Sequence, residues 1–290
     1  MRTDLLLVKD SKKLAKKKKQ LGRRTIIYCI LLIIAFISLG PFAFMFLISI
    51  QHTSFISGNP TRWLPHTPTL GTYIHVFKSS NFFRWLINSC LVGGGVTLLT
   101  LLIHSMSGYV FAKRQFPGRD IIFLIILSSI MVPRAVTILP QFLIVTRFHW
   151  LNTYLALIMP PLSLPIGVFM MKQFISTLPS ELEEAARLDG CSDFGIFGRV
   201  ILPLSKPGLV VLGIYTFMEQ WRDFIWPLIV TTVDEMKTLP VGLSTFHTEF
   251  QTDYGVMMAG VMLSILPISV VFLFGQRYFV KGLTLGAVKG

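Results

Sequence analysis

The sequence contains the segment Glu184-Ala185-Ala186-Arg187-Leu188-Asp189-Gly190, and the pair Leu202-Pro203 follows twelve residues after its glycine. The segment is polar and has a helical pattern, yet long apolar stretches lie on both sides of it. A membrane protein that keeps one such polar loop between its spans usually presents the loop to a partner. We therefore expect a helical hairpin that projects from a bundle of membrane helices.

The composition favours lipid as the main solvent of this chain. Hydrophobic residues make up 52% of it, charged residues 14%, and the mean hydropathy is +0.65. A membrane helix needs about 20 apolar residues, and six windows of roughly that length are present. They cover residues 25–50, 87–111, 121–145, 154–171, 208–228 and 256–279. The predicted fold is all-α, a polytopic membrane protein with about six transmembrane helices.

Basic residues predict how the chain is oriented, because they are enriched in cytoplasmic flanking segments. Ten of the first 24 residues are Lys or Arg, and Lys113, Arg114 and Arg119 follow the second span. Both termini are therefore expected in the cytoplasm, and the basic N-terminus is expected to touch anionic lipid rather than nucleic acid. The predicted parts are a basic tail (1–24), a first membrane helix (25–50), an outer loop (51–83), a membrane core (84–280) carrying the polar loop 172–206, and a C-terminal tail (281–290).

Motifs for chemistry on this chain are missing from the sequence. It has no G-x-x-x-x-G-K-[ST] segment to hold ATP phosphates and no H-E-x-x-H pair for zinc, and its three cysteines follow no metal or disulfide spacing. We therefore expect no enzyme activity, metal or cofactor on this chain. If ATP powers it, another subunit must hydrolyse the ATP.

The polar loop predicts a first short helix. Ser180 and Glu183 have the spacing of a capping box, so the helix is expected to begin at about Glu181. Gly190 supplies the left-handed residue that ends it. One narrow face is expected to carry both alanines and to admit a close neighbour; its members are Leu182, Ala185, Ala186 and Asp189.

A second short helix follows, capped by Ser192 or Asp193. Its apolar face is expected to hold Phe194, Phe197 and Val200, and Leu202-Pro203 is expected to end it. An alternative is that the hairpin merely packs on the ends of its own spans.

The segment resembles the signature E-A-A-x3-G-x9-I-x-L-P of permeases of ATP-binding-cassette importers. The matching residues are Glu184, Ala185, Ala186, Gly190, Leu202 and Pro203, with Val200 in the isoleucine position. Other stretches look like the MalG-type branch that serves carbohydrate uptake, namely Met131-Val132-Pro133, Leu151 to Tyr154, Trp226-Pro227-Leu228, Thr238 to Leu243 and Gly282 to Gly290.

The resemblance implies an assembly in a prokaryotic cell membrane. This chain and a second, MalF-type permease would form the channel, a cytoplasmic ATPase dimer would bind ATP and Mg²⁺, and an extracytoplasmic binding protein would deliver sugar. The polar loop would be the helix that docks on the ATPase, and the C-terminal tail would also reach it. Glu184 would make polar contacts there, Ala185 and Ala186 would permit close docking, and Gly190 would set the angle between the short helices. The resemblance also places Asp189, Leu202 and Pro203 among the residues that couple this loop to the ATPase.

Four charged residues lie inside predicted spans, where ionisable groups face a cavity or each other rather than lipid. They are Arg134, Glu219, Arg222 and Asp223. Glu219 and Arg222 have the spacing of a helical ion pair. Both roles, pathway lining and internal ion pairing, stay open, and Arg134 and Arg222 depart from the small or polar residues common in the family. Trp85, Trp150, Trp221 and Trp226 are expected in interfacial belts rather than stacked on sugar.

Three other functions remain open. The chain could be the permease of an importer of amino acids, phosphate or peptides, which share the loop. A secondary transporter is a second alternative, although no repeated architecture is visible. A membrane-embedded enzyme is the third, although no cluster of His, Asp or Ser supports it.

Overall fold

The computed structural model describes residues 2–51, 68–246 and 253–287, and these residues are helical without a β-strand. Apolar spans and helix-forming loops account for this all-α architecture, as the sequence predicts. The α-helices of five residues or more in the described chain are α1 (Arg2–Ser49), α2 (Gly71–Ser79), α3 (Phe82–Lys113), α4 (Arg119–Ser128), α5 (Arg134–Arg147), α6 (Tyr154–Ile158), α7 (Pro165–Ser176), α8 (Glu181–Leu188), α11 (Lys206–Arg222), α12 (Ile225–Val230), α13 (Leu239–Ser244) and α14 (Tyr254–Ala287).

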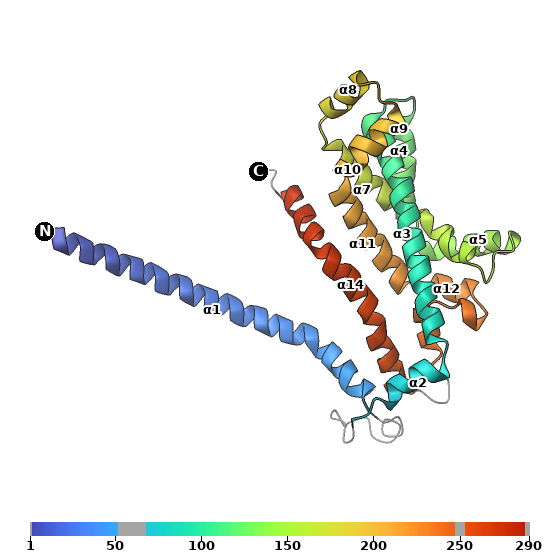
Figure 1. Cartoon of the computed structure of the whole chain (residues 1–290), viewed down its shortest axis with the longest axis horizontal. Coiled ribbons are helices and arrows are strands. Elements are labelled where there is room, and N and C mark those ends of the chain that lie inside the picture. The colour runs from blue at the N-terminus through green and yellow to red at the C-terminus, as the bar shows by residue number, and fades with distance from the viewer. Residues whose placement is uncertain (1, 52–67, 247–252, 288–290) are drawn as a thin grey trace.

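Helix α3 is the axis of the bundle, with α7 and α11 packed along it (Figure 1). Small residues permit this packing, because a methyl group on Gly108 of α3 would lie 2.5 Å from Cβ of Met171 in α7. The contact of α3 with α11 is similar, since a methyl group on Gly93 would lie 3.1 Å from Phe217. Glycine at both positions thus lets α7 and α11 approach α3 closely. We call the end of the bundle that carries residues 180–204 the hairpin end, and the opposite end, near α2, the far end.

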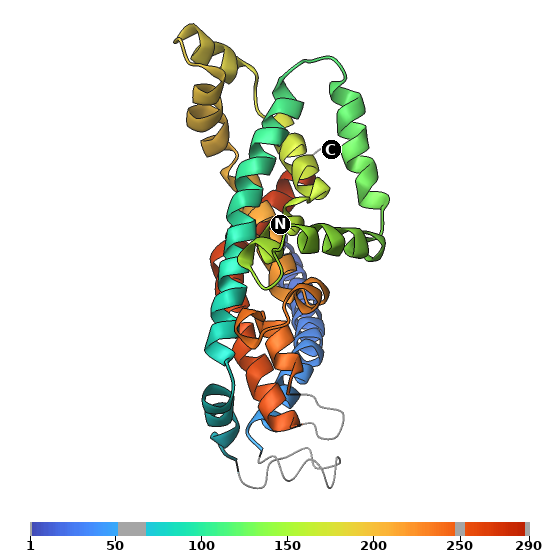
Figure 2. The ribbon, with the colours of Figure 1, turned by 90° about the vertical axis from the view of Figure 1, so that its right-hand side faces the viewer.

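Three single helices in the described residues could cross a membrane, and the number rises to six if each bent pair counts as one span. The single helices are Arg24–Ser49, Phe82–Lys113 and Tyr254–Phe274. The third predicted span, 121–145, is not straight, because the chain turns by 103° between Arg119–Met131 and Arg134–Arg147. Pro133 lies at this break, and α5 consequently runs crosswise to the long helices and projects from the side of the bundle (Figures 1 and 2).

The fourth span is bent as well, by 50° between Tyr154–Leu162 and Pro165–Ser176. The fifth ends at Arg222, and a break at Asp223 and Phe224 separates it from α12. Breaks of this kind expose backbone groups that side chains must satisfy inside a membrane. At the fourth span, Nε2 of His104 meets the carbonyl oxygen of Leu162 at 3.1 Å.

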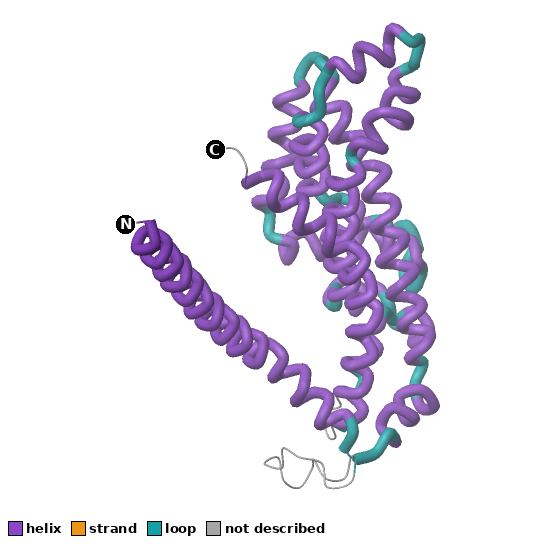
Figure 3. The backbone as a smooth tube through the Cα atoms, turned by 60° about the vertical axis from the view of Figure 1, so that its left-hand side comes forward, coloured by secondary structure: helices purple, strands orange, loops and turns teal. Residues whose placement is uncertain are grey.

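Helix α1 leans away from the bundle and meets it only toward its C-terminal end (Figures 1 and 3). The hydroxyl of Ser49 lies 2.8 Å from that of Tyr73 in α2. No residue of its apolar window is buried by the rest of the described chain, and Phe36 is 81% exposed. The predicted basic tail is helical from Arg2 and continuous with the first span.

Parts of the predicted outer loop and C-terminal tail are helical. Residues 52–67 of the outer loop lie outside the described residues, but its remainder contains helix α2. The predicted C-terminal tail from 281 is the last part of α14, which continues to Ala287. Residues 288–290 lie outside the described part.

Tryptophans at the far end belong to the core, so the predicted interfacial belt is wrong for three of them. Trp85, Trp221 and Trp226 are buried, whereas Trp150 is half-buried and stacks on Phe148. Trp85 occupies the space above Gly242, where a methyl group would lie 2.0 Å from the indole. The Trp85 ring thus fills the space beside Gly242 and packs α13 closely against α3.

Candidate functional site: the polar hairpin and the membrane-depth charges

The first helix of the hairpin begins where the sequence predicts, but the capping box is wrong. The backbone of Ser180 is already helical, and its carbonyl accepts the N–H groups of Glu183 and Glu184 at 3.0 and 3.1 Å. Its hydroxyl forms no capping bond among the described residues; it accepts a hydrogen bond from Lys113 at 3.4 Å. The carboxylate of Glu183 also turns toward Lys113 rather than back to the backbone of Ser180.

The turn between the two short helices follows the predicted chemistry. Gly190 has a φ of +81°, which confirms the left-handed conformation. Ser192 caps the second helix, because its hydroxyl accepts the N–H of Gly195 at 3.3 Å. A backbone bond from Cys191 to the carbonyl of Ala186, at 2.9 Å, closes the turn.

The second helix is longer than predicted, because three short pieces join into one. These are α9 (Asp193–Ile196), a π-helix (Phe197–Ile201) and α10 (Leu202–Leu204). Pro203 lacks an N–H, and the wider π turn directly before it accommodates that loss. The helix ends at Leu204, one residue beyond Pro203, and bends by 77° into α11.

The apolar faces differ from the predicted ones. Ala186 points into the bundle, whereas Ala185 and Leu188 point outward, with Leu188 90% exposed. In the second helix Phe194 is exposed, contrary to the prediction, whereas Phe197 is buried and Val200 is partly buried as predicted. Ile196 and Ile201 are buried as well. The inward residues of both helices join one apolar cluster with Tyr109, Met171, Ile175 and Leu212. The hairpin therefore packs on α3, α7 and α11, and leaves a second apolar face uncovered.

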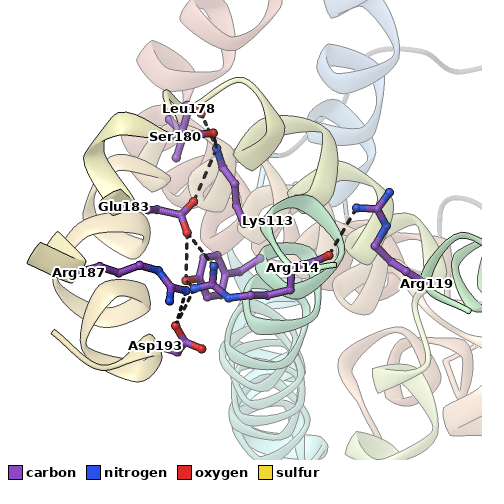
Figure 4. A network of polar contacts seen from close by, with 9 residues as sticks. Lys113, Arg114, Arg119, Leu178, Ser180, Glu183, Arg187 and Asp193 are labelled. Carbon is purple, nitrogen blue, oxygen red and sulfur yellow. Dashed lines mark hydrogen bonds and ion pairs between the residues drawn. The ribbon is translucent and has the colours of Figure 1, made fainter. Parts of the chain in front are cut away.

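A polar network joins the hairpin to the C-terminal end of α3 (Figure 4). Its centre is Glu183, whose side chain is 7% exposed. Lys113 lies 3.7 Å from one carboxylate oxygen, and Arg114 lies 3.1 Å from the other. Tyr109 donates to the same carboxylate at 3.4 Å. Lys113 also donates to the carbonyl of Leu178 at 2.6 Å.

Arg114 extends the network to the second short helix. Its other nitrogen, Nη2, contacts the Tyr109 hydroxyl and lies 3.0 Å from Asp193. Arg187 reaches the same oxygen of Asp193 at 2.8 Å. One guanidinium thus joins carboxylates from both helices of the hairpin. From the sequence, Glu183 was expected in a capping box, and Lys113 and Arg114 served only as a sign of orientation, so their joint network was not predicted.

The remaining predicted coupling residues are distributed over the outside of the hairpin. Glu184 and Asp189 are exposed, and Gly190 lies at the tip. Leu202 and Pro203 lie at the base, where the second helix meets α11. Exposed motif residues above a fixed base form a surface that a partner can contact without unfolding the hairpin.

The four predicted charges at membrane depth form two ion pairs. Arg134, at the start of α5, lies 2.5 Å from the carboxylate of Asp223, which ends α11. Arg222 pairs with Glu219 one turn earlier, as the spacing predicts. The two guanidinium groups are 55% and 71% exposed, whereas the Asp223 carboxylate is 8% exposed. Elsewhere in the described chain no group of three or more His, Cys, Asp or Glu side chains is placed to hold a metal.

Comparison with known proteins gives one family and a consistent set of relatives. Residues 104–285 match the family described as binding-protein-dependent transport system inner membrane component. The chain is 38% identical over 260 residues to the arabinooligosaccharides transport system permease protein AraQ of Halalkalibacterium halodurans, covering 89% of this chain and 93% of that protein. It is 31% identical over 278 residues to the trehalose/maltose transport system permease protein MalG of Thermococcus litoralis, covering 94% and 99%.

Among solved structures, a chain of a bacterial ABC transporter involved in import of the acidic polysaccharide alginate has the same fold. The TM-score is 0.76 at 22% sequence identity, over 88% of this chain and 95% of that chain. The region that matches the family, residues 104–285, includes the hairpin, α11 and most of α14.

Proposed function

This chain belongs to the family of binding-protein-dependent transport system inner membrane components, and we propose that it is the channel-forming subunit of an ATP-driven carbohydrate importer. The observation that carries the proposal is the hairpin: a polar helix pair, fixed to the bundle at its base and bearing the exposed motif residues Glu184 and Ala185. Relatives named for arabinooligosaccharides, trehalose/maltose and lactose support carbohydrate as the cargo.

In this proposal the uncovered face of the hairpin docks on a cytoplasmic ATPase. The face offers apolar groups at Leu182, Leu188 and Phe194 beside the small Ala185 and the acidic Glu184. ATP and Mg²⁺ bind on the ATPase dimer, because the chain itself has no phosphate-binding loop. Closure of the ATPase dimer then moves the hairpin. Rigid-body motion of the attached helices opens the pathway in turn to the two sides of the membrane.

The proposed orientation puts the hairpin end and both termini in the cytoplasm of a prokaryotic cell. Lys113, Arg114 and Arg119 lie at the hairpin end, and the ten basic residues of the first 24 lie in the N-terminal half of α1, before its apolar window. The far end then faces an extracytoplasmic sugar-binding protein. A second permease of the MalF type completes the channel, and the uncovered apolar length of α1 is consistent with contact to lipid and to that subunit.

We further propose that the two membrane-depth ion pairs face the translocation pathway. Arg134 and Arg222 are more than half exposed on this chain, and exposed guanidinium groups are costly against lipid. Each arginine has a carboxylate partner, so the cluster has no net charge and offers both donors and acceptors. Such a surface suits the hydroxyl groups of an uncharged sugar better than it suits the carboxylates of an acidic sugar.

The first experiment is to tag the chain, solubilise it gently from its native membrane, and identify the accompanying polypeptides by mass spectrometry. We expect an ATPase, a second permease and a binding protein, and ATP hydrolysis by the purified complex should rise when the sugar-loaded binding protein is added. A binding protein that holds amino acids or peptides would overturn the carbohydrate assignment. A lone chain or homo-oligomer that transports without ATP would identify a secondary transporter.

Coupling is tested by a variant on the exposed face of the hairpin. Ala185→Lys should abolish sugar uptake in proteoliposomes while the chain still accumulates and keeps its fold, because the side chain points away from the core. Ala185→Ser, which keeps the residue small and uncharged, is the matched control and should retain uptake. Normal uptake in Ala185→Lys would contradict docking through this face.

A further inference from the structure

The two adjacent glutamates of the hairpin have opposite environments. Glu184, the residue of the family motif, is exposed, whereas Glu183 is 5% exposed and points toward the end of α3. We infer that Glu183 is the positioning residue that fixes the orientation of the hairpin on α3 and so transmits motion of the hairpin to the membrane helices. The inference rests on the proposed docking of the hairpin on an ATPase.

The charges around Glu183 depend on one another. Lys113 and Arg114 supply two cations from consecutive positions, and Lys113 is only 8% exposed. Glu183 is the carboxylate that lies within ion-pair distance of both cations. Loss of its charge would leave the buried Lys113 ammonium group with two uncharged hydrogen-bond partners in the described chain, the carbonyl of Leu178 and the hydroxyl of Ser180. A buried ion pair is strongly disrupted by removal of one partner, because the other charge stays uncompensated.

The backbone reinforces the same arrangement. Lys113 and Arg114 lie at the C-terminal end of α3, where the helix dipole favours cations. Glu183 lies in the first turn of α8, where the dipole favours anions. Both helix ends therefore stabilise the ion pair that joins them, and the pair fixes where α8 begins relative to where α3 ends.

Arg114 also fixes the angle within the hairpin. Its guanidinium reaches Glu183 at 3.1 Å and Asp193 at 3.0 Å, and these carboxylates belong to different short helices. A planar fork holds two acceptors in a defined geometry, which a flexible ammonium group does not. Rotation of either short helix alone would break one of these bonds, so the hairpin and α3 move as one body.

Apolar packing under the hairpin does not provide the same constraint. The cluster around Ala186, Ile196 and Ile201 holds the hairpin on the bundle, but apolar contacts have no preferred direction. Without Glu183 the hairpin should remain attached while its orientation becomes variable. This separates a positioning role from a purely structural one: assembly with the ATPase persists, and transmission of the motion fails.

The test uses the full transporter complex in proteoliposomes with Glu183→Gln, which keeps the size of the side chain and removes its charge. Glu181→Gln is the matched control, because Glu181 is exposed on the first turn of the same helix. We measure ATPase retained in the complex, ATP hydrolysis, and sugar taken up per ATP. We expect retained ATPase and ATP hydrolysis in Glu183→Gln, with uptake per ATP reduced at least about fivefold, the lower end of typical coupling between sites.

Orientation is measured directly by the distance between spin labels at Leu188, on the outer face of α8, and Leu98, on α3, after the native cysteines are replaced by serine. Both side chains are exposed, at 90% and 70%. We expect one narrow distance distribution in the parent chain, a broad one in Glu183→Gln, and partial narrowing in Glu183→Asp, which restores the charge. Unchanged uptake per ATP together with an unchanged distribution would overturn the inference.

A second variant keeps the inference testable if Glu183→Gln fails to accumulate. Arg114→Lys preserves the charge but cannot hold both carboxylates, so it should broaden the same distribution and lower uptake per ATP. Normal values for both would overturn the inference. If no ATPase accompanies even the parent chain, the proposed function fails, whereas the distance distribution still tests the role of Glu183 by itself.

Discussion

His104 on α3 fills the space that Gly167 leaves on α7. A methyl group on Gly167 would lie 2.2 Å from Nδ1 of the imidazole. The same ring donates from Nε2 to the carbonyl oxygen of Leu162 at 3.1 Å, directly beside the break in the fourth span. One side chain therefore packs one half of the broken span and satisfies a backbone group of the other half.

Gly167→Ala should destabilise the bundle by about 1–3 kcal/mol, because the ring must leave its position and the core is overpacked. Thermal unfolding of the detergent-solubilised chain measures the effect. Gly94→Ala is the matched control, since no described atom lies within 4 Å of a methyl group there. Equal unfolding temperatures for the two variants would show that the fit of His104 over Gly167 contributes nothing to stability.

The ion pair between Arg134 and Asp223 leads to a second prediction. Arg134→Met leaves a carboxylate that is 8% exposed without its cation. We expect a loss of about 1–3 kcal/mol, smaller than for a fully buried pair because the arginine is itself 55% exposed.

Adding Asp223→Asn to Arg134→Met should recover most of that loss, since the unpaired charge is then gone. Thermal unfolding of the two single variants and the double variant gives the coupling between the positions. Strictly additive effects would argue against a direct ion pair. Sugar uptake by the stable double variant then tests the proposed pathway role separately from stability.

The presence of several apolar membrane helices could be predicted from sequence, because every pass needs an apolar stretch of about 20 residues. The shape of the passes could not. A hydropathy window counts apolar residues but says nothing about the direction in which the chain runs. Residues 121–145 were therefore predicted as one span, although the chain turns by 103° beside Pro133. Proline marks a position where a helix can break, but packing of α5 against distant residues such as Asp223 decides the angle.

The hairpin shows the same limit at the level of single residues. Gly190 and Ser192 behave as predicted, because a left-handed turn and a helix cap depend on neighbours in the chain. The capping box failed because Lys113 and Arg114, about 70 residues earlier, bind Glu183 more strongly than the backbone does. A local rule cannot detect partners that only the fold brings together.

Gly190 gives a third prediction, which concerns backbone conformation alone. Its φ of +81° disfavours any residue with a Cβ, while no described atom lies within 4 Å of the added methyl group. Gly190→Ala should therefore destabilise the turn by about 1–2 kcal/mol through strain. Gly190→Asn should cost less, because asparagine tolerates this conformation.

Gly198→Ala provides the control, since Gly198 lies in the π-helix with the same open surroundings and without positive φ. Limited proteolysis within residues 180–204 measures local opening of the hairpin. Equal cleavage rates in Gly190→Ala and Gly198→Ala would contradict the strain argument.

Asp234, in the loop at the far end, gives a prediction about pH. Partial burial alone would raise its pKa, but hydrogen bonds from Lys237 and Asn81 outweigh burial, so the pKa lies below its ordinary value of 3.8. The ionised carboxylate joins the loop to the start of α3, and Lys237 lies 2.9 Å from it. A lowered pKa means that this contribution is present above pH 3.8 and is lost as the pH falls through the folded-state pKa.

Asp234→Asn should therefore be less stable than the parent chain near neutral pH, and the difference should disappear at pH values below the ordinary carboxyl range. The effect should be small, because the side chain is 39% exposed and water screens its ion pair. Thermal unfolding of both chains across this pH range measures the difference, with Glu181→Gln as a control for a carboxylate on the opposite end of the bundle. A difference that grows as the pH falls would have the wrong sign for a carboxylate stabilised in its ionised form.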